Sequence, residues 1–290
     1  LTEGNNSAGL LIDADVGATR TSGEVHIADS SVTVTGEHSV AAWLSYGSSL
    51  EAEGSTLISD KGAGIVLSES AAVNLVDVTV KAAEESIRST LSLAGQVQEI
   101  TIGAGSDLTE NNGTLIVVTR TEEGTDGQVI LTLQKGSTSR GDIIDLGDKS
   151  AGGSMTVYLR EGADWKGIVQ GVDNFVSSPG GRSEFEDGSK IAGDLGGENS
   201  DFVFNGDATI GGNVVGDGSK FAFGSNGTTE ISGDVTGQNS TISFGSNSTN
   251  IIGGSVTGTN MNLTVGQNAV TEIAGTLEGT GSSFDFSHGG

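Results

Sequence analysis

The chain has 290 residues, among them 48 glycines, one proline and no cysteine, and its 38 acidic and 13 basic side chains give a formal net charge of −25. Glycine costs about 1 kcal/mol relative to alanine inside a helix, and nucleic acid or an anionic membrane needs a basic footprint on its partner. Composition and charge therefore exclude a mainly helical fold and both of those partners, and the lack of cysteine excludes a disulfide framework and a thiol nucleophile.

Residues 1–88 are predicted to form Ala- and Val-rich coils of β-structure. Three segments, which begin "SSVTV", "STLIS" and "DVTVK", recur at steps of about 22 to 24 residues. Each begins with a short apolar strand, and a corner of small residues leads from it to a second apolar strand. The leading strands carry Val32/Val34, Leu57/Ile58 and Val78/Val80, and the second strands start at Val40, Ile65 and Ile87.

Residues 89–183 are predicted to form less regular coils. The segments "EITIGAGSDL" and "VILTLQKGS" keep the alternation of apolar and polar residues that is typical of strands. In "MTVYLREGADWKGIV", four residues match the internal offsets of Phe202, Phe204, Ile210 and Val214, namely Val157, Leu159, Trp165 and Val169. The gap from Trp165 to Ile191 is longer and contains the only proline, so we predict a loop that protrudes from a corner at 174–182.

Residues 184–290 are predicted to form regular Gly- and Asn-rich coils with a constant repeat of about 21 residues. Four columns of apolar residues keep one register, and the steps between successive members are 19, 21, 21 and 21 in every column. The columns are Ile191, Ile210, Ile231, Ile252 and Ile273; Leu195, Val214, Val235, Val256 and Leu277; Phe202, Phe221, Ile242, Leu263 and Phe284; and Phe204, Phe223, Phe244, Val265 and Phe286.

This periodicity predicts an all-β fold, a parallel β-helix that runs as a single body over residues 1–290. Each coil of about 20 residues holds short strands joined at tight corners, and each strand pairs with its equivalent one coil away, at about 4.8 Å. Dividing the length by the period predicts about 13–14 coils. A β-sandwich or barrel would explain the alternation, but it would not explain columns at a fixed step.

The phrases "SSVTVTGEHSVAAWL", "KGAGIVL" and "GDVTGQNSTISFG" resemble the passenger domains of bacterial autotransporters of the pertactin and AIDA adhesin type. The resemblance covers most of the chain, in the style of its repeats. It implies a right-handed β-helix that is secreted through the Gram-negative outer membrane and is located at the bacterial cell surface or outside the cell. Its membrane link would be only a C-terminal barrel that is absent from this sequence.

The resemblance also implies an adhesin, which mediates cell–cell aggregation, biofilm formation or attachment to a host. The expected partners are a host-cell receptor, a matrix protein, or another copy of the chain on a neighbouring cell. Two alternatives remain open at this point. The chain could be a glycan-cleaving β-helix enzyme, or an inert stalk that presents a functional tip located elsewhere.

No catalytic residue, metal site or cofactor is predicted. The three histidines, His26, His38 and His288, accompany no nucleophile elbow, and no H-E-x-x-H or EF-hand spacing occurs. A glycosidase needs a pair of carboxylates, but the candidates are spread along corners: Asp142, Asp145, Asp164, Asp194 and Asp234.

Two features indicate binding. The tripeptide Arg140-Gly141-Asp142 presents a cation and an anion that some host integrins recognise, and such a tripeptide is a feature of the pertactin-like adhesins that the chain resembles. The second is a ladder of polar residues that follows the isoleucine column by three positions: Asp194, Asn213, Asp234, Ser255 and Thr276. We expect the ladder to contribute to self-association through many hydrogen bonds in register, or to consist of turn formers chosen for their backbone preferences.

Overall fold

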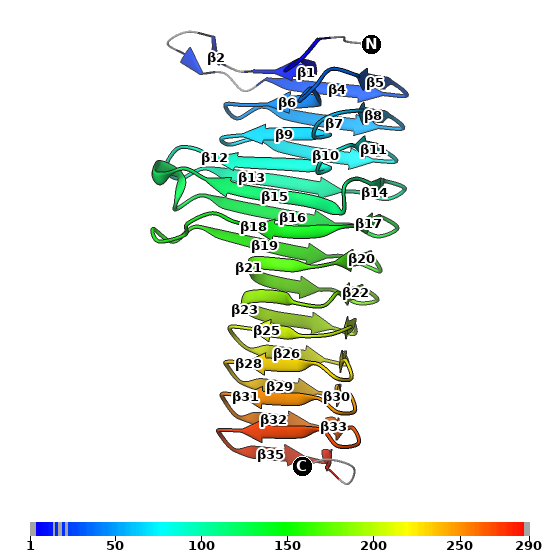
Figure 1. The fold of residues 1–290 in the computed structure, drawn as a ribbon, viewed down its shortest axis with the longest axis vertical. Helices are drawn as coiled ribbons and strands as arrows, with labels where there is room; N and C mark the ends of the chain where they lie inside the picture. The colour runs from blue at the N-terminus through cyan, green and yellow to red at the C-terminus, as the bar shows by residue number, and fades with distance from the viewer. Residues whose placement is uncertain (1–3, 14, 17–18, 21–22, 287–290) are drawn as a thin grey trace. The chain divides into compact units, whose positions relative to one another are not determined.

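The computed structural model describes residues 4–13, 15–16, 19–20 and 23–286 (Figure 1). These residues form two compact units, which divide between Thr156 and Val157 and are called unit 1 and unit 2 below. Strands dominate both units, and the described residues include one short 3-10 helix, η1 (Glu122–Gly124), and no α-helix. Each unit is a parallel β-helix, as the sequence predicts.

Unit 1 consists of three faces of parallel strands, and a complete coil contributes one strand to each face. The first face contains β5 (Ser31–Val34), β8 (Thr56–Ser59), β11 (Thr79–Ala82), β14 (Asp107–Glu110) and β17 (Thr138–Arg140). The second contains β4 (Glu24–Ala28), β7 (Ser49–Glu53), β10 (Ala72–Val76), β13 (Val97–Ile102) and β16 (Gln128–Leu133). The third contains β1 (Ala8–Ile12), β6 (Val40–Leu44), β9 (Ile65–Ser68), β12 (Ile87–Leu91), β15 (Thr114–Arg120) and β18 (Asp142–Asp145). A two-stranded antiparallel pair, β2 (Asp15–Val16) and β3 (Thr19–Arg20), follows β1 in the chain, and β19 (Ser154–Leu159) crosses the boundary residue.

Unit 2 also has three parallel faces. The first contains β20 (Asp164–Gly167), β22 (Arg182–Phe185), β24 (Asp201–Phe204), β27 (Lys220–Phe223), β30 (Thr241–Phe244), β33 (Asn262–Val265) and β36 (Ser283–Asp285). The second contains β25 (Ala208–Ile210), β28 (Thr228–Ile231), β31 (Thr249–Ile252) and β34 (Val270–Ile273). The third contains β26 (Val214–Asp217), β29 (Val235–Gln238), β32 (Val256–Thr259) and β35 (Leu277–Thr280). The long strands β21 (Val169–Ser177) and β23 (Ser189–Glu198) pair with each other, and β23 continues into both the second and the third face.

The predicted apolar columns of unit 2 are register partners. Ile191, Ile210, Ile231, Ile252 and Ile273 pair in succession from β23 to β34. The phenylalanine columns stack their rings, with centroids 4.8 Å apart for Phe202 and Phe221 and 4.9 Å apart for Phe204 and Phe223. Successive layers of the same strand are visible in Figure 1 as β26, β29, β32 and β35. Few apolar residues per coil are therefore enough for a core, because each one packs on its own equivalent.

The core of unit 1 confirms part of the predicted alignment, while Val34 pairs with Ser59 and Ile58 pairs with Thr33 and Lys81. Leu57 pairs with Val32 on one side and Val80 on the other, and all three lie on the first face. Ile65 pairs with Ile87, but its partner in the preceding coil is Ala42 and not Val40. The register of β6 therefore lies two residues away from the predicted one.

The predicted number of coils, about 13–14, is too high because some coils of unit 1 are longer than the repeat of unit 2. On the first face of unit 1, Thr79 pairs with Asp107, and Asp107 pairs with Thr138, so both of these coils are longer than the regular repeat of unit 2. Among the described residues this face has five strands in unit 1, and the equivalent face of unit 2 has seven. The long coils in the middle of the chain thus reduce the total to about twelve.

The predicted loop at 174–182 is wrong, and so is the alignment of Trp165. Residues Val169–Ser177 form strand β21, whose Phe175 is fully buried and pairs with Leu195. Only the tight turn that contains the single proline remains between β21 and β22. Trp165 is the register partner of Ser183, and Ser183 is the partner of Phe202, so Trp165 belongs to a phenylalanine column and not to the isoleucine column. A small serine in that column leaves room for the rings of Trp165 and Phe175, whose centroids are 5.6 Å apart.

Candidate functional site

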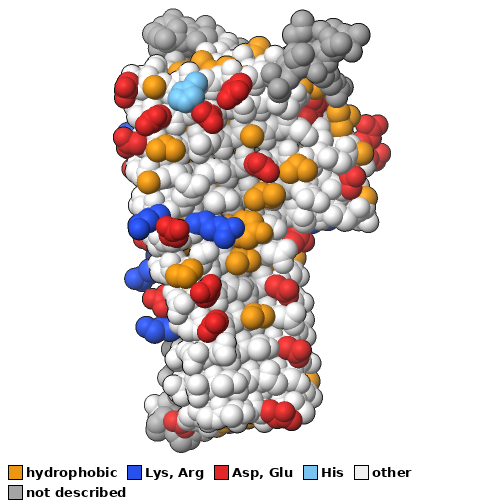
Figure 2. All heavy atoms as spheres, turned by 180° about the vertical axis from the view of Figure 1, so that it is seen from behind, with side chains coloured by type: hydrophobic (Ala, Val, Ile, Leu, Met, Phe, Trp, Pro, Cys, Tyr) orange, Lys and Arg blue, Asp and Glu red, His pale blue; other side chains and the backbone are white. Residues whose placement is uncertain are grey.

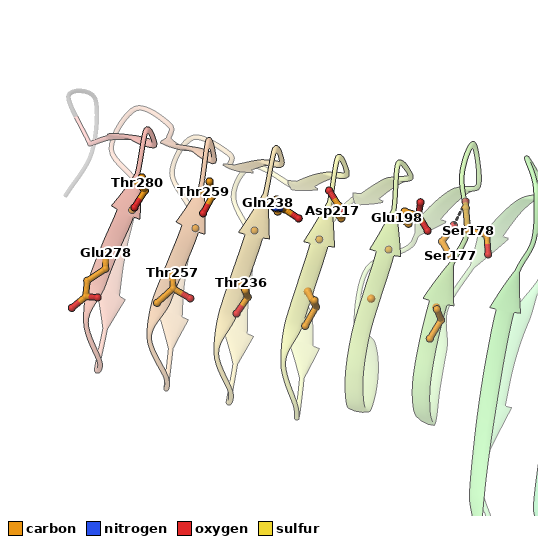
Figure 3. A pocket seen from close by; sticks show the side chains of 18 of the residues that line it. Ser177, Ser178, Glu198, Asp217, Thr236, Gln238, Thr257, Thr259, Glu278 and Thr280 are labelled. Carbon is orange, nitrogen blue, oxygen red and sulfur yellow. Dashed lines mark hydrogen bonds between the residues drawn. The ribbon is translucent and has the colours of Figure 1, made fainter.

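A groove runs across the outward surface of β21, β23, β26, β29, β32 and β35 in unit 2 (Figure 3). Its volume is about 790 Å³. Two columns of register partners line it, and they are called the first and second groove columns below. The first contains Val176, Gly196, Val215, Thr236, Thr257 and Glu278, and the second contains Glu198, Asp217, Gln238, Thr259 and Thr280.

Side chains at alternate residues of the strands under the groove point outward because a strand is pleated, and an inward glycine lies between the two columns. These glycines, one per coil, are Gly197, Gly216, Gly237, Gly258 and Gly279. A Cβ atom at Gly216 would lie 2.7 Å from the ring of Phe221, closer than real Cβ contacts. The large core rings therefore require glycine at this position. Parallel pairing of successive strands holds the members of each groove column about 4.8 Å apart.

The corner beside the second groove column is fixed by ladders of small polar residues. Asn199, Asn239 and Asn260 have left-handed backbone conformations, with φ of 45°, 51° and 52°. The side chain of Asn260 donates a hydrogen bond to the Asn239 side-chain oxygen at 3.2 Å. Next to them, the backbone N–H of Ser219 donates to the Ser240 hydroxyl at 3.2 Å. Because asparagine tolerates this backbone region better than most residues, the corner repeats without strain and holds the second groove column in line.

The groove is polar and acidic. Glu198, Asp217 and Glu278 contribute carboxylates, and the threonines and Gln238 contribute hydroxyl and amide groups. Among the described lining residues, Arg160 at the β21 end of the groove is the one cation. Its guanidinium lies 3.5 Å from the Ser178 hydroxyl and 4.4 Å from the centre of the Tyr158 ring. Figure 2 shows Asp and Glu side chains spread over one face, while Lys and Arg gather in one area of it. The acidic lining of the groove suits a neutral or cationic partner and disfavours an anionic one.

The predicted ladder satisfies the backbone of its own neighbours. The Asp194 carboxylate accepts the backbone N–H of Asn213 at 2.7 Å, and the Asn213 side-chain oxygen accepts the N–H of Asp234 at 2.9 Å. Asp234 accepts the N–H of Ser255 at 2.7 Å, and Ser255 accepts that of Thr276 at 3.1 Å. Each side chain therefore caps the corner of the next coil. This geometry favours the turn-forming interpretation, and self-association through the ladder stays a prediction.

The tripeptide Arg140-Gly141-Asp142 lies at a corner of unit 1 between two faces. Arg140 ends β17 and Asp142 begins β18, so a single residue, Gly141 with φ of 108°, makes the corner. The Asp142 N–H donates to the Gly113 carbonyl at 2.8 Å, and Asn111 donates to the Arg140 carbonyl at 3.1 Å. All three residues are half-buried. The backbone of the tripeptide is thus part of the coil, and the geometry differs from that of an extended loop tip.

The candidate carboxylates for hydrolysis are divided between the units, with Asp142 and Asp145 in unit 1 and Asp164, Asp194 and Asp234 in unit 2. Asp145 is fully buried in unit 1, where it makes ion pairs with Arg120 and Lys149. Asp194 and Asp234 belong to the ladder. His26 and His38 are exposed and lie beside Glu51 and Glu84, with contacts of 3.2 and 3.7 Å, while His288 is outside the described residues.

Within residues 4–13, 15–16, 19–20 and 23–286, no three His, Cys, Asp or Glu side chains are grouped so that they could hold a metal ion. In the same part of the chain, no helix is long and apolar enough to span a bilayer.

Ion pairs outside the groove shift two pKa values in unit 2. Lys166 on β20 and Glu184 on β22 lie side by side, with 2.7 Å between Nζ and Oε1. The hydrogen bond from Lys166, together with one from Asn205, holds the pKa of Glu184 below its ordinary value. The same hydrogen bond raises the pKa of Lys166. Both side chains are partly exposed, so this pair stabilises the coil contact weakly.

Comparison of the chain with protein-family models, with curated proteins and with solved structures found no match.

The groove columns were not predicted from the sequence. A signal was present in the repeated phrases "VVGD", "VTGQ", "VTGT" and "LEGT", in which a glycine separates two residues once per coil. Alternation alone does not say which side of a strand faces outward when one of the inward residues is glycine. The side chains that fill the space above these glycines are Phe202 at Gly197, Phe221 at Gly216 and Met261 at Gly237 and Gly258, and only the structure shows that packing.

Proposed function

We propose that the chain is the adhesive, surface-displayed part of a secreted bacterial protein, and that unit 2 holds its partner in the groove. The observation that supports this proposal is the pair of groove columns, which present outward polar groups in register on successive strands. A partner that spans several coils makes the same contact repeatedly. Weak individual hydrogen bonds then add up to a stable attachment.

The charge of the chain favours a partner other than a second copy. Two chains with a net charge of −25 repel each other. The ladder, which was the candidate for self-association, already accepts backbone N–H groups of its own chain. The partner that suits the groove is therefore a host-cell receptor or matrix protein with a neutral or basic surface. Display at the bacterial cell surface is part of this proposal, and it rests on the repeat style described above.

Beads coated with the chain provide the test, with adhesion to immobilised fibronectin, laminin and collagen and to cultured epithelial cells as the readout. The variant Thr236→Arg/Thr257→Arg places two large cations in the first groove column. The matched control, Thr228→Arg/Thr249→Arg, makes the same change at register partners on β28 and β31, outside the groove. We expect the groove variant to weaken adhesion about tenfold, which corresponds to about 1.4 kcal/mol, and the control to adhere like the parent chain.

Equal adhesion of the two double variants would contradict a role for the groove. Clumping of coated beads with one another would identify a second copy as the partner. Attachment to cells that is abolished by Asp142→Glu, and unaffected by the groove variant, would assign adhesion to the tripeptide. A chain that attaches to nothing in these assays would be an inert stalk.

A further inference from the structure

Unit 1 has an exposed tryptophan, Trp43, whose side chain lies outside the core. Trp43 lies on β6 and is 41% exposed, whereas Trp165, the other tryptophan of the chain, is fully buried. The side chains before and after Trp43 on β6, those of Ala42 and Leu44, are buried. Trp43 therefore occupies an outward position, and its neighbour in the adjacent coil is Leu11, which is 67% exposed. Exposed aromatic surface next to an exposed leucine is unfavourable in water unless a partner covers it.

A hollow of about 380 Å³ adjoins the tryptophan. Its lining combines apolar surface with oxygen-bearing side chains, in particular Leu11, Trp43, Tyr46, Asp13, Ser45 and Glu69. The lining has two carboxylates and no Lys or Arg among its described residues. A small hollow with one apolar wall and several convergent polar groups is the usual form of a binding site for a small ligand.

Hydrogen bonds hold this lining in place. The indole N–H of Trp43 donates to the Ser68 hydroxyl at 3.2 Å, which fixes the direction of the ring. The Ser45 hydroxyl donates to the Asp13 carboxylate at 3.1 Å. Since a carboxylate has about four lone-pair positions, Asp13 can accept hydrogen bonds from a ligand as well as from its own chain. A lining that is already oriented loses little entropy when a ligand binds.

We infer that this hollow binds one neutral pyranose unit of a glycan. A pyranose ring has an apolar face of C–H groups and a rim of hydroxyls. The C–H face would pack on the indole of Trp43, and the rim hydroxyls would donate to the carboxylates of Asp13 and Glu69. The two carboxylates disfavour uronic acids and sulfated sugars, because like charges would be brought together. This site lies in unit 1 and is independent of the groove in unit 2.

The two tryptophans make the inference measurable by fluorescence. In Trp165→Phe the emission comes from Trp43 alone, and in Trp43→Phe it comes from the buried Trp165. We would first identify a bound sugar on an array of neutral oligosaccharides that includes cellohexaose, mannohexaose and chitohexaose. The same oligosaccharide is then titrated while acrylamide quenching is recorded. If Trp165→Phe does not fold, the difference between the parent chain and Trp43→Phe supplies the same signal.

We expect a neutral oligosaccharide to protect Trp43 from acrylamide and to leave Trp165 unaffected. Trp43→Ala should raise the Kd for that oligosaccharide at least tenfold, or about 1.4 kcal/mol. Leu11→Ala should also weaken binding, whereas Leu146→Ala, which alters a side chain of the same 67% exposure outside the hollow, should not. Two results would overturn the inference: no neutral oligosaccharide on the array protects Trp43, or Trp43→Ala binds the oligosaccharide as tightly as the parent chain.

Discussion

In unit 2 the last coils repeat at a constant step, from Lys220 to Thr241 and on to Asn262, whereas in unit 1 the step lengthens along the chain, from Thr56 to Thr79, to Asp107 and to Thr138. The regular coils satisfy their corners with ladders, in which each side chain bonds to its equivalent one coil away. The longer coils keep part of this pattern, as in the hydrogen bonds from the backbone N–H of Ser30 to the Ser55 hydroxyl and from that of Val78 to the Ser106 hydroxyl.

Unit 1 adds individual contacts to this pattern, and one of them is the buried ion pair between Arg120 and Asp145. Both side chains are fully buried. The Arg120 guanidinium also donates to the carbonyls of Gly127 at 3.3 Å and Ser154 at 3.1 Å, so it ties the segment after η1 to the following coil. Repeated weak bonds therefore stabilise the corners of both units, and the irregular coils of unit 1 have a strong and specific contact in addition.

The largest effect is therefore expected from the buried ion pair of unit 1. Asp145→Ala leaves the Arg120 charge buried with its main partner removed, and we expect a loss of about 3–5 kcal/mol in the free energy of unfolding. Chemical denaturation followed by circular dichroism measures it. The control Arg120→Met/Asp145→Leu removes both charges and should recover most of the loss. A loss below about 1 kcal/mol in Asp145→Ala, the size of an exposed pair, would show that the contact is not the anchor described here.

The inward glycines of unit 2 should give the next largest effect. Gly216→Ala places a methyl group against the ring of Phe221, and we expect a loss of about 1–3 kcal/mol in the free energy of unfolding. Gly196→Ala is the matched control, since a Cβ there meets nothing within 4 Å. Thermal unfolding of the two variants compares them directly. Equal unfolding temperatures would contradict the assignment of Gly216 to the inward side.

The ladder of unit 2 should show a smaller effect. Asp234→Ala removes the acceptor of the Ser255 N–H, and we expect a loss of about 0.5–1.5 kcal/mol. Asp217→Ala, an exposed acid of the second groove column, should change the free energy of unfolding by less than about 0.5 kcal/mol. Hydrogen exchange of the Ser255 amide checks the cause, because that amide should exchange faster only in Asp234→Ala.

The smallest effect concerns the Lys166–Glu184 pair. Because its folded-state pKa is lowered, Glu184 contributes stability above its ordinary pKa, and this contribution is lost as the pH falls below about 4. The raised pKa of Lys166 contributes stability at lower pH, and it is lost as the pH rises above about 10. Lys166→Met should flatten the acid side of the curve of unfolding free energy against pH. An unchanged slope in that variant would argue against the pair.

The fold could be predicted from the sequence to different extents in the two units. The columns of unit 2 were predicted residue by residue, because a fixed step leaves one register for Ile210, Ile231 and Ile252. The predicted alignment of Trp165 was wrong because the step between coils is shorter there, from Trp165 to its partner Ser183. Where the step changes, the sequence alone does not show to which apolar column a large residue belongs. The predicted loop at 174–182 was wrong for the same reason, because Phe175, which pairs with Leu195, was not assigned to an apolar column.

The binding surfaces were harder to predict than the core. The tripeptide was recognised as a motif, but its corner geometry depends on the position of Gly113 one coil away. The groove depends on which residues face outward beside a glycine, and the hollow beside Trp43 depends on residues from three different coils. Contacts between coils set these features, and a single phrase of the sequence does not contain them.

Cysteine cross-linking is the most direct test of the stacked register, because the chain has no cysteine of its own. Val215 and Thr236 are register partners on β26 and β29. Partner Cα atoms in adjacent strands are about 4.8 Å apart, within the range that a disulfide spans. Val215→Cys/Thr236→Cys should therefore form a disulfide on mild oxidation, and the offset pair Val215→Cys/Gln238→Cys should not. Cross-linking of the offset pair, with none between the partners, would contradict the parallel register on which the whole account depends.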